Sequence, residues 1–449
     1  MLIPSVDRVI ENGSTKRTNY RWAVMGMIFV MFTISFADRA NIGALLPVIT
    51  KEFSLTNFQA GAIASFFFLG YLITQIPGGL LASKYGTRGL VALAIFGFSI
   101  FTFLLGTATA ALQLILYRFG LGFFEGPSPV GGTSTIQNWF PPREKATATG
   151  IYIGSTQFAP IIVVPICVWI MLRFGWRYVF YLFSIPGLVM CVIWYLFVRN
   201  KPEESPHCSP AEVKYIRELN PLEKTGRREE RSLGWLDRVI KFKYFPLLET
   251  NREVFRSWTF WGLTVSYSLM VGVIFGLMIW IPSYLVNAKH YSYVKMGFMG
   301  ATPWIGGLVG SLVGGWLSDK VFLKRRKPLM LVTTVMTTVM MALLINAPGD
   351  TLVLGTYLFS TGLLIYVGYP LFTTYLMDIT TGTTFPLAFG VMNALATLFN
   401  FFTPMIAGAL IDAFNYGAVF IFFGCYSIIS FFIVLMVNER SYFATDFVK

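Results

Sequence analysis

The chain of 449 residues has few charged side chains, because Asp, Glu, Lys and Arg together make up only 13% of it. A soluble globular protein carries about 25% charged residues. The same chain is 55% hydrophobic, and a single soluble core stops growing near about 250–300 residues. So much apolar surface has its natural solvent in lipid, which excludes a cytosolic enzyme, a nucleic-acid reader and a disulfide scaffold.

Residues that hold metals or form disulfides are also scarce. Four cysteines and two histidines occur, with no CxxC pair and no metal-type spacing. The GxxxxGK(S/T) nucleotide loop is missing, so the sequence shows no ATP motor of its own. The first 21 residues lack the ordered regions of a cleavable signal peptide. We therefore expect no metal and no cofactor, and the first hydrophobic run to act as the insertion signal.

Long hydrophobic runs dominate the chain instead. A membrane-spanning helix needs about 20 mainly apolar residues. Twelve stretches meet this length, at 22–49, 58–82, 89–108, 112–133, 147–171, 175–198, 258–287, 295–317, 327–346, 351–377, 385–411 and 416–437. The predicted fold is an all-α membrane protein of twelve transmembrane helices in two pseudo-symmetric six-helix bundles.

A polar stretch rich in charge and proline separates the sixth and seventh runs. We expect it to carry short surface helices around 210–219 and 233–242. The predicted division is a cytoplasmic N-terminal tail at 1–21, a first bundle at 22–199, a cytoplasmic central loop at 200–257, a second bundle at 258–438 and a cytoplasmic tail at 439–449.

Lysine and arginine gather on one side of this predicted membrane. With the N-terminus inside, about 28 of the 35 basic side chains fall on the cytoplasmic side and about five outside. This bias predicts that both termini are cytoplasmic. It also explains the net charge of +13 through attraction to anionic lipid, so no nucleic-acid partner is needed.

One loop motif occurs in both halves of the chain. Gly79, Gly86 and Arg88 lie in the first copy, between the second and third runs. Gly315 and Asp319 lie in the second copy, 236 residues further on. Many secondary transporters are built from such repeats. We assign these five residues to a cytoplasmic gate, in which small side chains let helix ends approach.

Four ionisable side chains lie deep inside the predicted spans. Asp38 and Arg39 are in the first span, and Arg118 and Glu125 are in the fourth. A charge at mid-membrane costs about 2.5–3.5 kcal/mol on insertion scales, and such residues tend to be functional. A helical rise of about 1.5 Å per residue brings Asp38 and Arg118 to one level and places Glu125 about 10 Å nearer the cytoplasm on the same face as Arg118, so the four can line one water-filled path.

These four residues suit the transport of an organic anion. A guanidinium binds a carboxylate with two parallel hydrogen bonds, which makes Arg39 and Arg118 the predicted substrate ligands. A substrate that captures an arginine changes the proton affinity of a neighbouring acid, so Asp38 and Glu125 are the predicted proton-coupling residues. The alternative is a pair of static ion pairs, Asp38 with Arg118 or with Arg39, that hold two helices together.

Other polar side chains within the spans can hydrogen-bond the hydroxyl groups of a polyol. The predicted substrate-binding set includes Tyr71, Thr156, Gln157, Thr373 and Asn393, and weaker candidates are Gln75, Tyr152, Tyr369, Thr374 and Asn400. Taken singly, such residues more often join one helix to another.

With its loop repeat and twelve runs, the chain resembles the major facilitator superfamily. More specific patterns are ADRAN at 37–41, QIPGG at 75–79, RFGLGFFEGP at 118–127, NWFPPREKA at 138–146 and WIPSYL at 280–285. With them the chain resembles the anion:cation symporters, which include galactonate, glucarate and hexuronate permeases. The resemblance implies alternating access, protonation at Asp38 and Glu125, a basic pair at Arg39 and Arg118, and substrate contacts from Tyr71 and Asn393.

The chain departs from this pattern at three places. Ser83 stands in the first loop copy where the superfamily usually has Asp. The glutamine of the fifth span aligns with Thr156, whereas Gln157 is one residue along; a one-residue step turns a side chain by about 100°, so either can face the substrate. The tenth span matches the galactonate type poorly, which leaves the substrate open.

The sequence thus predicts a secondary active transporter and no enzyme. It imports an aldonate, aldarate or hexuronate with protons across the cell inner membrane, with Na⁺ left open as the coupling ion. Its partners are the organic anion, the ion and the lipid bilayer, and we expect a monomer. The alternative is an organic-anion antiporter or exporter; drug efflux is disfavoured because the GxxxGPxxGG signature is missing from the fifth span. A membrane-bound sugar transferase is disfavoured because the central loop holds no catalytic cluster.

Overall fold

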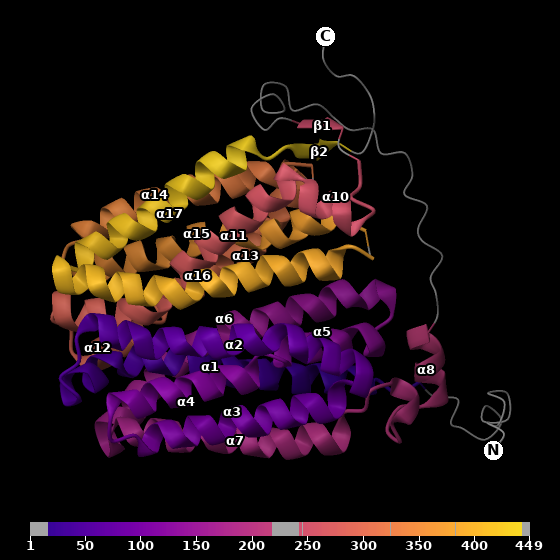
Figure 1. The fold of residues 1–449 in the computed structure, drawn as a ribbon, viewed down its shortest axis with the longest axis horizontal. Coiled ribbons are helices and arrows are strands. Elements are labelled where there is room, and N and C mark those ends of the chain that lie inside the picture. Colours follow the sequence, from indigo (N-terminus) through magenta and orange to yellow (C-terminus); the bar gives the residue numbers. More distant parts are fainter. Residues whose placement is uncertain (1–16, 218–241, 245, 324, 382, 442–449) are drawn as a thin grey trace, which may run out of the picture.

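The computed structural model describes residues 17–217, 242–244, 246–323, 325–381 and 383–441. Nearly all of its regular structure is helical, and the long helices lie side by side (Figure 1). Helices of the first half of the chain, indigo to magenta, form one group, and those of the second half, pink-red to yellow, form the other.

The first half comprises α1 (Tyr20–Glu52), α2 (Asn57–Tyr85), α3 (Thr87–Thr107), α4 (Ala111–Glu125), α5 (Ser128–Trp139), α6 (Pro142–Phe174) and α7 (Trp176–Phe197). The connecting region comprises η2 (Pro202–Glu204), α8 (Pro210–Arg217), β1 (Phe242–Tyr244) and α10 (Asn251–Arg256). The second half comprises α11 (Trp258–Ser283), η3 (Tyr284–Ala288), α12 (Tyr293–Met299), α13 (Thr302–Trp316), η4 (Leu317–Val321), α14 (Lys327–Ile345), α15 (Thr351–Ile379), α16 (Phe385–Ala413), α17 (Tyr416–Met436) and β2 (Glu439–Ser441), which pairs in parallel with β1.

Eleven helices of the described chain are long and apolar enough to cross a membrane. The run predicted as the fourth span, 112–133, is divided in the structure: α4 ends at Glu125 and α5 begins at Ser128. Pro127 stands at this break, where it has no N–H group to continue the helical ladder. With 15 and 12 residues, both pieces are shorter than a usual span.

The predicted surface helix around 210–219 corresponds to α8. The one predicted around 233–242 lies outside the described residues except for its last position, which belongs to β1.

The two halves repeat one mode of helix packing. A Cβ added at Gly70 of α2 would lie 2.1 Å from the carbonyl oxygen of Phe119 on α4. A Cβ added at Gly306 of α13 would lie 2.0 Å from that of Phe359 on α15. The two glycines are 236 residues apart and the two phenylalanines 240. Small residues let helix backbones touch inside a membrane, and here the same contact is built twice.

The close approach near the loop motifs is made one residue earlier than predicted. A Cβ at Gly315 would meet nothing within 4 Å, and one at Gly79 would meet only a valine methyl at 3.9 Å. By contrast, a Cβ at Gly78 would lie 2.8 Å from the Pro127 side chain, and one at Gly314 would lie 1.9 Å from a carbonyl oxygen of α15. One residue turns the direction by about 100°, so Gly79 and Gly315 point away from the contact.

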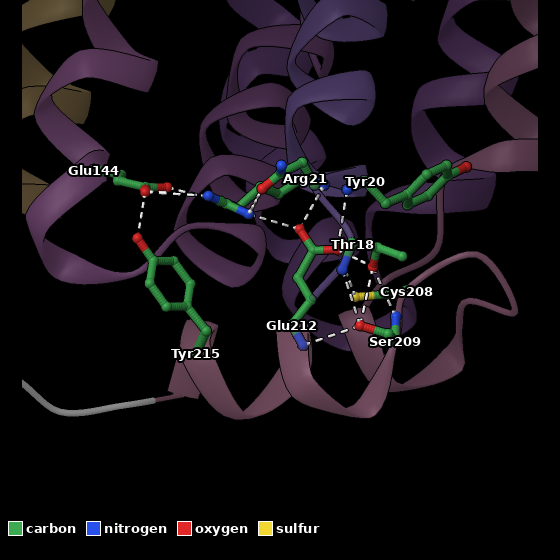
Figure 2. A network of polar contacts seen from close by, with 9 residues as sticks. Thr18, Tyr20, Arg21, Glu144, Cys208, Ser209, Glu212 and Tyr215 are labelled. Carbon is green, nitrogen blue, oxygen red and sulfur yellow. Dashed lines mark hydrogen bonds and ion pairs between the residues drawn. The ribbon is translucent and has the colours of Figure 1, made fainter. Parts of the chain in front are cut away.

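A polar network fastens α8 to the start of the first half, and Figure 2 shows it. The buried Glu212 carboxylate of α8 accepts hydrogen bonds from the Thr18 hydroxyl (2.6 Å), the backbone N–H of Tyr20 (3.0 Å) and Nη1 of Arg21 (2.9 Å). The other edge of the Arg21 guanidinium donates to Glu144 at the start of α6 (2.7 Å). Burial raises the pKa of Glu212, but the hydrogen bonds from Thr18 and Arg21 outweigh it and hold the pKa below its ordinary value.

We predict that the contribution of Glu212 depends on pH. A carboxyl whose pKa is lowered by folding adds stability above its unfolded pKa and loses it as the pH falls through the folded value. Glu212→Gln should therefore lower the free energy of unfolding by about 2 kcal/mol near neutral pH. The difference from the wild type should shrink as the pH falls below about 4.5.

Thermal unfolding of both proteins in micelles across this pH range measures the difference. Glu203→Gln is the matched control, because Glu203 is half-exposed and pairs with the half-exposed Arg217 of the same segment. A Glu212→Gln protein as stable as the control at neutral pH would contradict the prediction.

A second prediction concerns the glycine contacts. A Cβ at Gly362 of α15 would lie 1.7 Å from the carbonyl oxygen of Pro303. Gly362→Ala must push α13 and α15 apart, which should cost about 1–3 kcal/mol of unfolding free energy. Gly315→Ala should leave the thermal midpoint unchanged, because its Cβ enters open space. Equal midpoints for the two variants would refute the packing argument.

Candidate functional site

The four predicted intramembrane charges come together between α1 and α4. Asp38 is 1% exposed, Arg39 8%, Arg118 1% and Glu125 0%. Residues four apart on a helix share a face, as do residues seven apart. Ser35 and Arg39 therefore point from α1 toward α4, where Arg118 and Glu125 lie seven residues apart.

The central contact is an ion pair between Arg39 and Glu125. Nε of Arg39 donates to Oε1 of Glu125 at 2.8 Å, and Nη2 donates to the same oxygen. The Ser35 hydroxyl is a third donor to Oε1, at 2.6 Å. The second oxygen, Oε2, is buried and has no hydrogen-bond partner in the described part of the chain. A buried acceptor without a partner is costly, so a hydrogen-bond donor that reached Oε2 would stabilise it.

Aromatic rings surround the guanidinium of Arg39. The guanidinium carbon lies 4.4 Å from the ring centre of Phe36, 5.1 Å from Phe67 and 4.9 Å from Tyr71. Phe275 of α11 lies 6.0 Å away and belongs to the other half of the molecule. Cation–π attraction is strongest where water is excluded, so these rings stabilise the buried cation.

Asp38 and Arg118 are held differently. Nη1 of Arg118 donates to the backbone carbonyl of Asp38 at 2.8 Å. The Asp38 carboxylate accepts hydrogen bonds from the hydroxyl of Thr102 on α3 (2.8 Å) and from the amide of Asn41 (3.2 Å). The predicted alternative, an ion pair of Asp38 with Arg118 or with Arg39, is absent from the described residues. Asp38 and Arg39 are neighbours on a helix and point about 100° apart, so one faces α3 and the other α4.

The second half contributes a cluster of tyrosines. The rings of Tyr267 on α11 and Tyr369 on α15 stack with centres 5.6 Å apart, and their hydroxyl oxygens are 3.2 Å apart. The Tyr267 hydroxyl donates to the side-chain oxygen of Asn393 at 3.4 Å. Asn393 therefore lies where the polar groups of the second half gather, and Thr373 lies near Tyr267. Tyr267 is not among the residues predicted from the sequence, although a lone tyrosine within an apolar span is the same signal that identified Tyr71.

The two candidates in the fifth span are placed differently. The Thr156 hydroxyl donates to the carbonyl of Ile153 on its own helix (2.7 Å). Gln157 is 2% exposed, and its amide oxygen has no partner among the described residues. The amide oxygens of Gln75 and Asn400 share this property. Three buried acceptors without donors suit the hydroxyl groups of a polyol.

The first loop motif is built around a glycine turn. Gly86 has φ of +82°, and a Cβ there would lie 2.5 Å from the side chain of Asn200. Only glycine adopts this backbone conformation freely. Arg88, two residues on, donates from Nε to the carbonyl of Tyr195 at 2.8 Å.

The second loop motif forms an ion-pair cluster. Asp319 pairs with Arg326 at 2.8 Å, and the same guanidinium donates to Asp378 at 3.1 Å. The acid of the second copy therefore acts within its own half. Elsewhere in the described chain, no group of three His, Cys, Asp or Glu side chains is arranged to hold a metal ion.

Known proteins resemble this chain over most of its length. The profile of the Major Facilitator Superfamily matches residues 28–380 and 325–445. The chain is 30% identical over 320 residues to the probable galactarate/D-glucarate transporter GudP of Bacillus subtilis (strain 168), covering 69% of this chain and 67% of that protein. It is 26% identical over 461 residues to the probable galactarate/D-glucarate transporter GarP of Escherichia coli (strain K12), covering 97% and 98%. These relatives are transporters and not enzymes.

Solved structures share the fold. A bacterial homolog of the human lysosomal transporter Spinster, in an inward-facing and occupied conformation, matches 94% of this chain and 97% of its own at a TM-score of 0.74 and 17% identity. A D-xylose–proton symporter matches 94% and 98% at a TM-score of 0.72 and 16% identity. With its many apolar helices and its bacterial relatives, the chain is a multi-pass protein of the cell inner membrane.

We predict that Arg39 and Glu125 depend on each other for stability. Removing one partner leaves the other charge buried and unpaired, which should cost about 3–5 kcal/mol for Arg39→Gln or Glu125→Gln alone. The double variant should lose much less than the sum of the two single losses. Thermal unfolding of the wild type, the two single variants and the double variant in micelles gives the free energies of this double-mutant cycle.

The control for this cycle is Glu52→Gln. Glu52 pairs with Arg177 at 2.7 Å, but both side chains are more than a third exposed, so the loss should be only about 0–1 kcal/mol. Additive losses for Arg39→Gln and Glu125→Gln would show that the pair is not an energetic unit.

Proposed function

The chain belongs to the Major Facilitator Superfamily, and we propose that it is a secondary active transporter that takes up a sugar acid together with protons. The observation that carries this proposal is the buried Arg39–Glu125 pair, in which one carboxylate oxygen receives every donor and the other has none among the described residues. Such a pair can exchange its partners for a substrate carboxylate and a proton.

The proposed topology has twelve spans and both termini in the cytoplasm. The fourth span consists of α4 and α5 together, and the eighth of α12 and α13. The proposed parts are the tail at 1–21, the first bundle at 22–199, the cytoplasmic loop at 200–257, the second bundle at 258–438 and the tail at 439–449. The proposed molecule works as a monomer, because the charged cluster and the tyrosine cluster come from one chain.

Charge balance gives the physical reason for coupling. With all four groups ionised, Asp38, Arg39, Arg118 and Glu125 have no net charge. An anion that enters this buried cluster leaves it with one negative charge, which is costly in a low-dielectric interior. One proton entering with each substrate charge restores neutrality. Coupling then follows from the avoided cost of a buried net charge.

The exchange is proposed to take place at Arg39. The substrate carboxylate accepts the two N–H groups of Arg39 that now bind Glu125, in the parallel geometry that guanidinium favours. Glu125 loses its contact with the Arg39 cation and takes a proton, which Oε2 can accept because it has no hydrogen-bond partner among the described residues. Arg118 holds the helix at Asp38 and adds positive potential. Asp38 is the second proton site, which a dicarboxylate would require.

The hydroxyl groups of the substrate are proposed to meet amide and phenol groups. Tyr71 lies beneath Arg39, and Gln157 offers an acceptor from α6; Thr156 lies beside it. The second half offers Asn393 and Thr373 beside its tyrosines. This set fits an acid with several hydroxyl groups, and galactarate, glucarate and galactonate transporters are among the relatives. Aldarates, aldonates and hexuronates are the proposed class.

The cytoplasmic gate is proposed to close around the two loop motifs. Gly86 and Arg88 shape the first turn, and the Asp319 cluster fastens the second. Gly79 and Gly315 lie beside the glycines that make the helix contacts and complete the two motifs.

Uptake into proteoliposomes tests the function. The wild type is given labelled glucarate, galactarate, galactonate and glucuronate, with an inward proton gradient, an inward Na⁺ gradient or neither. We expect accumulation of at least one acid that follows the proton gradient. Glu125→Gln should abolish this accumulation but keep exchange of internal for external substrate, because exchange needs no net proton movement.

The control variant is Glu52→Gln, whose carboxylate lies outside the charged cluster. Its gradient-driven uptake should equal that of the wild type. Accumulation that follows the Na⁺ gradient would identify Na⁺ in place of H⁺ as the coupling ion. Uptake that does not respond to either ion gradient would overturn symport. So would accumulation that requires an outward gradient of unlabelled substrate anion. Either result would favour exchange or export.

A further inference from the structure

Three helices begin with backbone N–H groups that bind a carboxylate from a distant segment. Glu212 of α8 receives the first N–H groups of α1. Glu439 of β2 receives the backbone N–H groups of Arg326 (3.2 Å) and Lys327 (2.7 Å) at the start of α14. Asp412, near the end of α16, receives those at the start of α2. Glu212 caps a helix of the first half from the central region, and Glu439 caps a helix of the second half from that half's C-terminal strand, whereas Asp412 joins the two halves.

The backbone N–H groups in the first turn of α2 find hydrogen-bond acceptors in two places, Thr56 and Asp412. The third N–H, that of Gln59, binds the Thr56 hydroxyl in a capping box, and the fourth binds the Thr56 carbonyl. The first N–H, that of Asn57, donates to Oδ1 of Asp412 at 2.9 Å, and the second, that of Phe58, to Oδ2 at 2.8 Å. A helix leaves four N–H groups without internal partners, so Asp412 supplies half of this cap.

Asp412 also binds the side chain of the first helical residue. Nδ2 of Asn57 donates to Oδ1 at 2.7 Å. Three hydrogen bonds from α2 to Asp412 thus cross between the described residues of the two halves, and the Thr56 side chain also hydrogen-bonds this carboxylate. Apolar and backbone contact surrounds them: a Cβ at Gly61 of α2 would lie 2.3 Å from the carbonyl oxygen of Pro404 on α16.

We propose that Asp412 is the latch that holds the two halves closed at the end of the molecule where α2 begins. The inference rests on the alternating access of the proposed function, because a transporter that opens toward this side must separate α2 from α16. The carboxylate also faces the positive end of the α2 dipole, which strengthens the bond. Among the described residues, no carboxylate of the first half makes the matching bond to the start of α12; a Cβ added at Gly297 of α12 would instead lie 3.0 Å from a methyl group of Val168 on α6.

The latch is weak enough to open. Asp412 is exposed and Asn57 is partly exposed, so water can replace every hydrogen bond when the halves part. A carboxylate at an exposed helix start biases an equilibrium by a few-fold and not by orders of magnitude. The latch therefore sets the population of the state open on this side.

The experiment measures that population directly. The reporter is Ser65→Cys, a conservative change at a fully buried position one helical turn deeper than Gly61 on the same helix. A membrane-impermeant maleimide is applied from the side where α2 begins, and labelling of the reporter thiol is followed by mass spectrometry. Asp412→Asn should raise the labelling rate about five-fold, which corresponds to ~1 kcal/mol at 298 K. Asparagine has an NH₂ group in place of one carboxylate oxygen. This group is a donor, so it cannot accept the backbone N–H that the oxygen bound.

A second variant changes the other side of the latch. Asn57→Pro removes two of the three α2 donors, and proline is favoured at the first position of a helix. The preceding Thr56 already has the extended backbone that proline requires (φ −70°, ψ 160°). This variant should leave the thermal midpoint unchanged and raise labelling as Asp412→Asn does. It keeps the proposal testable even where Asp412→Asn does not fold.

Glu52→Gln is the matched control, because Glu52 is an exposed carboxylate at the same end that binds Trp176 and Arg177 of its own half. Its labelling rate should equal that of the parent. Unchanged labelling in Asp412→Asn and Asn57→Pro, or an equal rise in Glu52→Gln, would overturn the latch. Labelling requires no substrate, so a chain that carries no sugar acid but shows these shifts would refute the proposed function and keep the latch.

Discussion

A charged side chain inside a bilayer must have partners, and this constraint arranges the centre of the molecule. Arg39 binds Glu125 and the surrounding rings, and Asp38 binds a hydroxyl and an amide. Arg118 binds a backbone carbonyl through Nη1, while its buried Nε has no partner among the described residues. These bonds join α1 to α3 and α4. The first half is therefore held together by the same groups to which we assign substrate and proton binding, so the proposed chemistry would act directly on its packing.

The two halves share a packing scheme but not this chemistry. The glycine contacts of α2 with α4 recur between α13 and α15. At the same spacing of 240 residues, however, Glu125 corresponds to Ile365 and Arg118 to Leu358. The second half offers stacked tyrosines and an asparagine instead. One half thus carries the charges and the other neutral hydrogen-bonding groups, a division suited to a substrate with a carboxylate at one end and hydroxyl groups along its length.

The three carboxylates that cap helix starts differ in the segments that they join and in their burial. Glu212 fixes the central loop to the first half, and Glu439 fixes the C-terminal strand to the second. Both are buried, so their bonds are costly to break. Asp412 makes the same kind of bond across the halves but is exposed, where water replaces it at little cost. Burial therefore distinguishes the two lasting bonds, those of Glu212 and Glu439, from the bond of Asp412 that we propose to open.

Hydropathy and spacing were enough to predict the helices and the identity of the charged residues, because lipid demands long apolar runs and penalises each charge. Eleven of the twelve predicted runs are single candidate spans, and the twelfth is divided at Pro127. Which charge pairs with which was decided only in three dimensions: Asp38 and Arg39 are adjacent in sequence, yet the helix turns one toward Thr102 and the other toward Glu125. The contacts of Tyr267 with Tyr369 and Asn393, and the cap that Asp412 places on α2, were likewise decided only by the tertiary structure, since they depend on helices that lie far apart in the chain and meet only when the bundles pack.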